Sequence, residues 1–252
     1  MSFFEVYKRD SSLDKKKKEL LNKVKQKEAK ELLENGIIVK ENFLDNQKVE
    51  YILNQLLDIL KKYETKPGKI ELDNGSYIDI RGYDKDVDIG KVDWYHIDKV
   101  IDVSDIDLEY IKNIITEIEP SLELKNFNSY IDKGVTTARG FHSDSYGVFH
   151  YKAFVYLTDV PDLSYGPYTY IKKSHIATNY RLFNQIKNKI LNNERTDITI
   201  YDKNLVMPML AKKGTLIISD QTGFHRGWPQ EENKFRAILT MNFAPKNFDI
   251  GY

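Results

Sequence analysis

Apolar residues in the first third of the chain recur every three to four positions, which is the spacing of an amphipathic helix. One such series lies within residues 12–33 and a second within 45–60. Asn35-Gly36 follows the first series, and both residues tolerate the left-handed conformation in which helices commonly end. Asp45 precedes the second series and suits an N-cap. The pattern predicts two helical regions joined by a short strand at 36–43.

Beyond residue 69 the pattern changes to short strands, with further helices predicted at 108–118 and about 177–191. Runs rich in Ile, Val, Tyr, Phe and Thr, separated by turn signals, lie at 122–131, 150–158, 167–172, 198–201, 205–210, 214–219 and 235–243. Many short strands without regular strand–helix alternation favour a mainly β barrel or sandwich, buttressed by helices, over a parallel α/β sheet. No repeat or linker divides the chain. We therefore expect residues 1–252 to form a single domain, with helices of about 12–62 packed on the β core.

The composition of the chain restricts the chemistry that it can carry out more than it restricts the possible folds. The 252 residues include 38 basic and 38 acidic side chains, and this balance argues against a general nucleic-acid or membrane-surface binder. The absence of cysteine excludes disulfides, iron–sulfur clusters and thiol nucleophiles, so any metal must be held by His, Asp or Glu. No secretory leader is visible and no apolar run approaches the roughly 18 residues of a membrane span, so we expect a cytoplasmic protein.

Two of the five histidines lie in suggestive places. His142 and Asp144 form a His-X-Asp pair, and in an extended segment their side chains point to the same side with Cα atoms about 7 Å apart. His225 follows a strand and a turn. Two imidazoles and one carboxylate make the facial triad that suits non-haem Fe(II) and leaves positions open for substrate and oxygen. Taken alone, the His-X-Asp pair is also explained by a structural histidine beside an aspartate.

Arg236 adds to this pattern because it follows His225 by 11 residues, at the start of the strand FRAILTMNF. We expect two antiparallel strands joined by the loop 228–234 to bring the two side chains together. Period-two alternation places Arg236 on one face with Ile238, Thr240 and Asn242. A buried arginine requires an anion, which a bound dicarboxylate would supply in a bidentate geometry. A salt bridge at a barrel mouth would satisfy it equally.

Four segments, in order, resemble the phytanoyl-CoA dioxygenase family of Fe(II)- and 2-oxoglutarate-dependent oxygenases. They are AKELLENGIIVKENFLDNQKVEYI, FHSDS, YKAFVYLTDVPDLSYGPYTYIKKSH and GTLIISDQTGFHRGWPQEENKFRAIL, and they extend from about residue 29 to 244. The chain departs from the family at Gly227, where Ser is frequent, and at Lys172-Lys173, which replace the usual Pro-Gly before Ser-His.

The resemblance implies a double-stranded β-helix core of the jelly-roll or cupin-like kind. It assigns His142, Asp144 and His225 to Fe(II), and Arg236 to the far carboxylate of the cosubstrate 2-oxoglutarate. Phe154 and Asn128 fall near positions where the family contacts this cosubstrate. Phe154 also alternates with Lys152, Tyr156 and Thr158, a stripe that would line either a pocket or an ordinary core with a snorkelling lysine. The remaining histidines, His96, His150 and His175, are expected to be structural or substrate-facing.

The implied activity is a dioxygenase reaction with O2 that hydroxylates a C–H bond and releases succinate and CO2. Related halogenases have a small residue in place of the carboxylate, so Asp144 favours hydroxylation over halogenation. Regions 63–105 and 159–166, which mix acidic and aromatic residues, are expected to cover the pocket mouth and to suit a small polar metabolite. Alternatives are a cupin-like non-redox isomerase or ligand-binding barrel, and a non-enzymatic member of the family. Monomer and homodimer both stay open.

Overall fold

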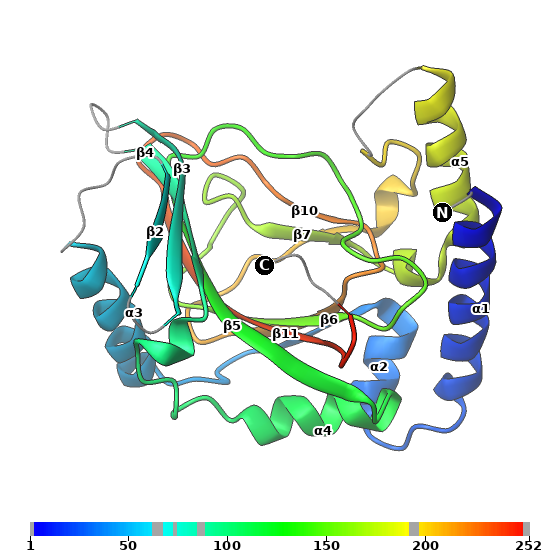
Figure 1. Cartoon of the computed structure of the whole chain (residues 1–252), viewed down its shortest axis with the longest axis horizontal. Helices are drawn as coiled ribbons and strands as arrows, with labels where there is room; N and C mark the ends of the chain where they lie inside the picture. Colours follow the sequence, from blue (N-terminus) through cyan, green and yellow to red (C-terminus); the bar gives the residue numbers. More distant parts are fainter. Residues whose placement is uncertain (1–2, 62–67, 73–74, 85–88, 192–196, 249–252) are drawn as a thin grey trace.

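The computed structural model describes residues 3–61, 68–72, 75–84, 89–191 and 197–248. Its helices are α1 (Phe3–Leu21), α2 (Lys27–Asn35), α3 (Asn46–Leu60), α4 (Leu108–Ile118) and α5 (Thr178–Ile190). Its strands are β1 (Ile37–Lys40), β2 (Gly68–Glu71), β3 (Tyr77–Asp84), β4 (Ile89–Tyr95), β5 (Leu122–Lys133), β6 (Tyr151–Tyr156), β7 (Tyr168–Ile171), β8 (Val206–Pro208), β9 (Leu216–Asp220), β10 (His225–Gly227) and β11 (Phe235–Pro245). Helices surround a β core, as predicted (Figure 1).

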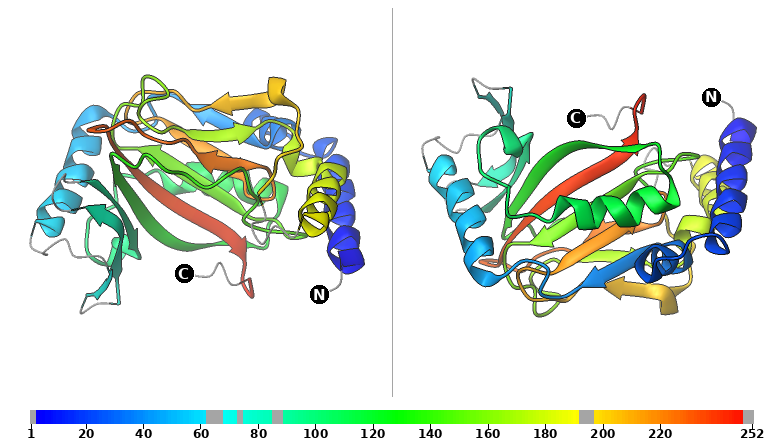
Figure 2. Two further views of the ribbon diagram at one scale, coloured as in Figure 1. Left: turned by 90° about the horizontal axis from the view of Figure 1, so that it is seen from above. Right: turned by 90° about the horizontal axis from the view of Figure 1, so that it is seen from below.

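The strands form two antiparallel sheets. The larger sheet has the order β1-β9-β6-β11-β5-β4-β3-β2, and the smaller has the order β10-β7-β8. Both sheets contribute side chains to one cavity, so they face each other across it (Figure 2). Consecutive strands alternate between the sheets from β6 to β7 and from β10 to β11. This arrangement is the double-stranded β-helix expected from the sequence.

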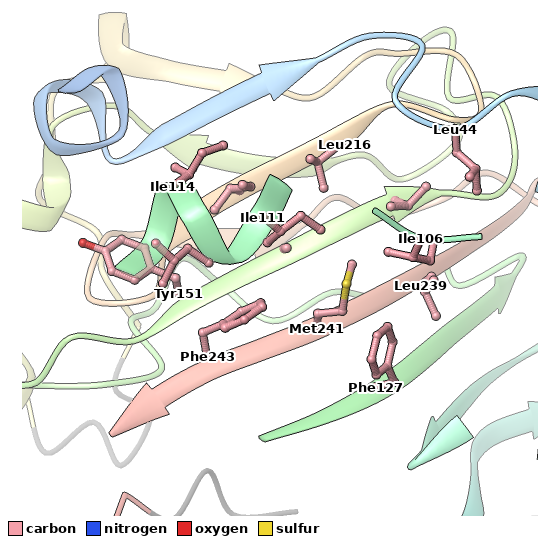
Figure 3. Packing of buried hydrophobic residues seen from close by; sticks show 14 of the residues in the cluster. Leu44, Ile106, Ile111, Ile114, Phe127, Tyr151, Leu216, Leu239, Met241 and Phe243 are labelled. Atoms are coloured by element: carbon pink, nitrogen blue, oxygen red, sulfur yellow. The ribbon is translucent and has the colours of Figure 1, made fainter. Parts of the chain in front are cut away.

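The outer face of the larger sheet carries the main apolar core. Along β11 the predicted alternation holds, because Leu239, Met241 and Phe243 are at most 1% exposed and pack in one cluster. Ile111 and Ile114 of α4 lie over this face (Figure 3). The apolar stripe of α4 therefore closes the outside of the sheet and leaves the inner face of β11 free to line a cavity.

The predicted helix at 12–33 is wrong in its continuity, because the structure divides it into α1 and α2. A turn after Leu21 leads into α2, and the backbone N–H groups of Lys25 and Gln26 donate to the Glu117 carboxylate of α4 at 2.6 and 3.2 Å. A helix start that is capped by a side chain about 90 residues away leaves no local sequence signal. The predicted ends are confirmed: Gly36 is left-handed at φ 77°, and Asp45 accepts a bond from Lys48 N.

Helix α5 presents its polar face to the protein and its apolar face outward. Arg181 and Asn184 are at most 1% exposed, whereas Phe183 and Ile190 are 55% and 75% exposed. The buried face lies beside α1 (Figure 1) and is held by hydrogen bonds and ion pairs. α5 is therefore anchored by charge pairing, in contrast to α4.

The remaining predicted elements agree with the structure within a few residues, except that 198–201 forms only an isolated bridge between Ile198 and Phe141. In the described part of the chain, none of the helices has the length and apolar character needed to span a bilayer.

Candidate metal centre

The three side chains that the sequence singled out converge at one point between the two sheets. A short antiparallel bridge joins His142 to His225, with N–O distances of 3.0 and 2.9 Å in the two directions. The next alternate residue, Asp144, is fixed by its backbone N–H, which donates to Gln221 O at 2.9 Å. Among the described residues, His142, Asp144 and His225 are the group of potential metal ligands, and their donor atoms lie within 4.8 Å of one another.

Both imidazoles are oriented by the same local contact. Nδ1 of His142 lies 2.9 Å from Gly140 O, and Nδ1 of His225 lies 3.1 Å from Gly223 O. Because a carbonyl oxygen can only accept, each ring donates Nδ1–H to the carbonyl two residues earlier and directs its Nε2 inward. Burial lowers the pKa of His225, although the Asp144 carboxylate opposes that shift. The neutral form is the one that binds a metal.

Asp144 is the charged member of the group. Its Oδ1 lies 3.4 Å from Nε2 of His142, and its Oδ2 lies 3.4 Å from Nε2 of His225 and 3.0 Å from Nζ of Lys152. Burial alone would raise the pKa of Asp144, but the charge of Lys152 and the neighbouring His225 outweigh burial and hold it well below its usual range. The carboxylate is therefore ionised across the neutral pH range.

A cavity of about 440 Å³ opens onto this group. Residues from β4, β5, β6, β7, β10 and β11 and from the segments at 135–139 and 228–230 line it. The predicted cover from region 63–105 is supplied by Lys91, Asp93 and Tyr95 of β4. The expectation for 159–166 is wrong, because that loop is absent from the lining. Its place near the mouth is taken by the segments that flank His142 and β10.

Arg236 lines the cavity as predicted, but the strand pairing that was expected to place it there does not form. β10 and β11 belong to different sheets, so the expected pairing of the two strands is wrong, and His225 and Arg236 face each other across the cavity. The guanidinium of Arg236 forms a buried ion pair with Asp132, its register partner on β5. Its Nε is buried and has no hydrogen-bond partner among the described residues.

The two remaining predicted site residues lie on β6 and β5, the strands on either side of β11. Phe154 of β6 lines the cavity, and its ring centroid is 4.6 Å from that of Tyr168. Asn128 of β5 is fully buried; its Oδ1 accepts from His96 N at 3.2 Å. Its Nδ2 has no hydrogen-bond partner in the described part of the chain. Asn128 is opposite Thr240, which is opposite Phe154, so the three residues form one row across the inner face of the sheet.

Sequence reasoning did not assign Asp132, Tyr168 and Lys152 to the site. Asp132 becomes visible only once the register of β5 against β11 is known. Tyr168 is 5.6 Å from the His225 ring between centroids and donates or accepts at Ser219 Oγ. Lys152 is 6% exposed and does not snorkel. The sequence indicated a place for Lys152 in the site only through its alternation with Phe154 along one strand.

His150 and His175 lie outside the group of potential metal ligands. His175 is fully buried, and its Nε2 contacts Leu33 O at 2.8 Å. His150 is 3% exposed and packs against Phe248. Burial lowers the pKa of each to about 4. Among the described residues neither joins the group of potential ligands.

No protein-family model and no curated protein matches the chain. Solved structures do match. The non-haem alpha-ketoglutarate-dependent epimerase SnoN from nogalamycin biosynthesis is 12% identical with a TM-score of 0.55, and the match covers 89% of this chain and 82% of SnoN. The carbocyclase SnoK, from the same biosynthesis, is 13% identical with a TM-score of 0.57, covering 89% and 85%. HygX from Streptomyces hygroscopicus is 13% identical with a TM-score of 0.56, covering 89% of each chain. These likenesses confirm the predicted fold.

Proposed function

We propose that this chain, with residues 1–252 acting as one domain, is an Fe(II)- and 2-oxoglutarate-dependent oxygenase that oxidises a C–H bond of a small polar metabolite. The observation that carries the proposal is the convergence of His142, Asp144 and His225 on a cavity that also contains the Arg236 guanidinium. Structures of the same fold support it: SnoN is described in complex with Fe3+ and alpha-ketoglutarate, and HygX with nickel, 2-oxoglutarate and hygromycin B.

The residues present fit both groups. Two neutral imidazole nitrogens and one carboxylate oxygen are a donor set that suits Fe(II), and both Nε2 atoms point inward because Nδ1 is engaged. A dicarboxylate requires hydrogen-bond donors. Within the described residues, Arg236 Nε and Asn128 Nδ2 are buried donors without partners. Buried donors are ordinarily paired, so an anion bound in the cavity beside Arg236 would satisfy an existing demand, whereas Asn128 is not among the residues that line the cavity.

Each side chain then has a role in the proposal. His142, Asp144 and His225 would hold the metal, Arg236 would bind the far carboxylate of 2-oxoglutarate, and Phe154 and Tyr168 would wall the site and exclude water. Bound Fe(II) would supply the activation of O2 and the coupling of 2-oxoglutarate oxidation, with release of succinate and CO2, to oxidation of the substrate. The protein's own task is to fix the geometry and select the carbon that is presented.

Hydroxylation is the outcome we propose, because Asp144 retains the carboxylate of the ligand set. SnoN is described as an epimerase and SnoK as a carbocyclase, so the fold also supports other outcomes. Incorporation of 18O from 18O2 into the product separates the possibilities. A hydroxylase transfers one labelled oxygen to the product, whereas an epimerisation or ring closure transfers none.

The decisive test is anaerobic addition of Fe(II) and 2-oxoglutarate to the purified protein. A weak visible charge-transfer band is expected, followed by substrate-stimulated succinate release when air and candidate polar metabolites are added. The His225→Ala variant is the control and should show neither signal. Absence of the band at saturating ligand would favour a non-redox isomerase or a ligand-binding barrel instead.

A further inference from the structure

Lys152 is a lysine inside the barrel, beside the metal centre. It lies on β6 between Ser219 of β9 and Asn242 of β11, and its side chain is 7% exposed. Its Nζ is 3.0 Å from Oδ2 of Asp144. A buried ammonium is costly unless it is paired, so the contact with Asp144 is a fixed part of this wall.

The two oxygens of Asp144 are otherwise equivalent. Oδ1 is 3.4 Å from Nε2 of His142, and Oδ2 is 3.4 Å from Nε2 of His225. The distances to the imidazoles therefore do not decide which oxygen meets a metal, or whether both do. Lys152 breaks this equivalence because its ammonium hydrogen-bonds to Oδ2.

We propose that Lys152 is a positioning residue that retains Oδ2 of Asp144 and makes Asp144 a one-oxygen ligand through Oδ1. The inference rests on the proposed function, since it concerns the same metal. A facial triad leaves three of about six positions open, but a carboxylate that binds through both oxygens would fill a fourth. Lys152 thus keeps room for a chelating cosubstrate together with O2.

The test replaces Lys152 with methionine, which retains the apolar stem and removes the ammonium. Mn(II) is added to the otherwise metal-free protein, and broadening of its EPR lines by H2 17O gives the number of metal-bound waters. Three waters are expected for the unaltered chain and two for Lys152→Met, because the released Oδ2 replaces one. 2-Oxoglutarate affinity is expected to fall about tenfold in the variant, as for other groups that orient metal ligands.

Lys213→Met is the matched control. It removes a lysine that pairs with Glu50 at 2.7 Å, and neither residue lines the cavity. Three waters are expected there, as in the unaltered chain. An unchanged water number in a folded Lys152→Met protein would overturn the inference.

Two further results separate this inference from the proposed function. If the unaltered chain and Asp144→Ala bind Mn(II) equally, the proposed site itself is wrong. If Lys152→Met does not fold, a crystal structure of the unaltered chain with Mn(II) decides the question. A metal bonded to Oδ1 with Lys152 on Oδ2 supports the inference, and a metal bonded to both oxygens overturns it.

Discussion

Two clusters of charged side chains, most of them buried, differ in their surroundings. The cavity cluster consists of Asp132, Asp144, Lys152 and Arg236. The helix cluster consists of Asp10, Asp14, Lys17, Arg181 and Asp220, and it joins α1 and α5 to the end of β9. Both contain buried cation–carboxylate pairs, but the side chains of Lys17 and Asp220 are at most 1% exposed, whereas the cavity cluster lines the cavity of about 440 Å³.

The helix cluster is closed in the sense that each of its cations lies against a carboxylate of the cluster, although Asp10 Oδ1 is buried without a hydrogen-bond partner among the described residues. Lys17 pairs with Asp220 at 2.7 Å and donates to Thr222 Oγ1 at 2.7 Å. Arg181 contacts Asp10 and Asp14 and also donates to Thr222 O. Burial lowers the pKa of Lys17, against the opposing charge of Asp220, and burial raises the pKa of Asp10. These shifts are the signature of charges that serve the fold.

The cavity cluster is incomplete by comparison. Asp144 is 22% exposed on its side chain, and Arg236 has a buried Nε without a hydrogen-bond partner among the described residues. Similar chemistry would therefore have two uses in one molecule: the closed cluster fixes the segment that carries His225, and in the proposed function a ligand completes the open one. Substitutions in the two clusters should accordingly separate activity from stability.

The largest expected effect is loss of activity without loss of the fold. His225→Ala removes one potential metal ligand. The fold loses little by comparison, namely the hydrogen bond from the ring to Gly223 O. Succinate release should fall to background while the thermal melting temperature changes by only a few degrees. Full succinate production by the folded variant would contradict the assignment of the metal centre.

The helix cluster should show the opposite behaviour. Lys17→Met leaves Asp220 buried without its cation, so the free energy of unfolding should fall by about 3–5 kcal/mol in urea titrations. The neighbour Lys16 is the control, since its pair with Glu119 involves a lysine that is 54% exposed. Lys16→Met should cost about 0–1 kcal/mol. Equal losses of unfolding free energy in the two variants would contradict the distinction between the buried pair of Lys17 and the exposed pair of Lys16.

Arg236→Lys tests the open cluster while preserving its charge. The ammonium can still pair with Asp132, but it lacks the planar fork that binds a carboxylate through two bonds. The dissociation constant of 2-oxoglutarate should rise about 10- to 100-fold, corresponding to about 1.4–2.8 kcal/mol, in titrations of the charge-transfer band. Arg9→Lys, at an exposed arginine of α1 that does not line the cavity, is the control and should leave the constant within about twofold. An unchanged dissociation constant in Arg236→Lys would indicate that this arginine serves only to pair with Asp132.

The smallest expected effect is a change in the pH dependence of the unfolding free energy. It concerns His175, whose backbone carbonyl accepts a hydrogen bond from Lys17 of the helix cluster. Burial lowers the pKa of His175 to about 4 from 6.5, so between these values the unfolded chain binds one more proton than the folded chain. Stability from this residue is present above pH 6.5 and is lost as the pH falls toward 4, at about 1.4 kcal/mol per pH unit. His175→Gln should reduce the slope of unfolding free energy against pH by that amount. Urea titrations at pH 5 and 6 measure it, and an unaltered slope would contradict the shift.

The sequence predicted what local pattern and spacing determine. Alternation along 235–243 placed Arg236 on the inner face, and the His-X-Asp spacing directed two side chains to one side. What it missed depends on partners far away in the chain. Asp132 meets Arg236 only through the register of β5 and β11, and the start of α2 depends on Glu117 of α4. The polar inner face of α5 also runs against the rule that apolar stripes face the core.

The pairing of Lys17 with the segment near Thr222 has a consequence for synthesis of the chain. These two residues are 205 positions apart, so α1 leaves the ribosome long before its buried partners exist. Until then the Lys17 ammonium lacks the carboxylate with which it pairs in the folded protein. The same late segment delivers His225. The buried partners of Lys17 and the last proposed metal ligand thus arrive within a few residues of each other, and a chain that stops short of residue 220 lacks both.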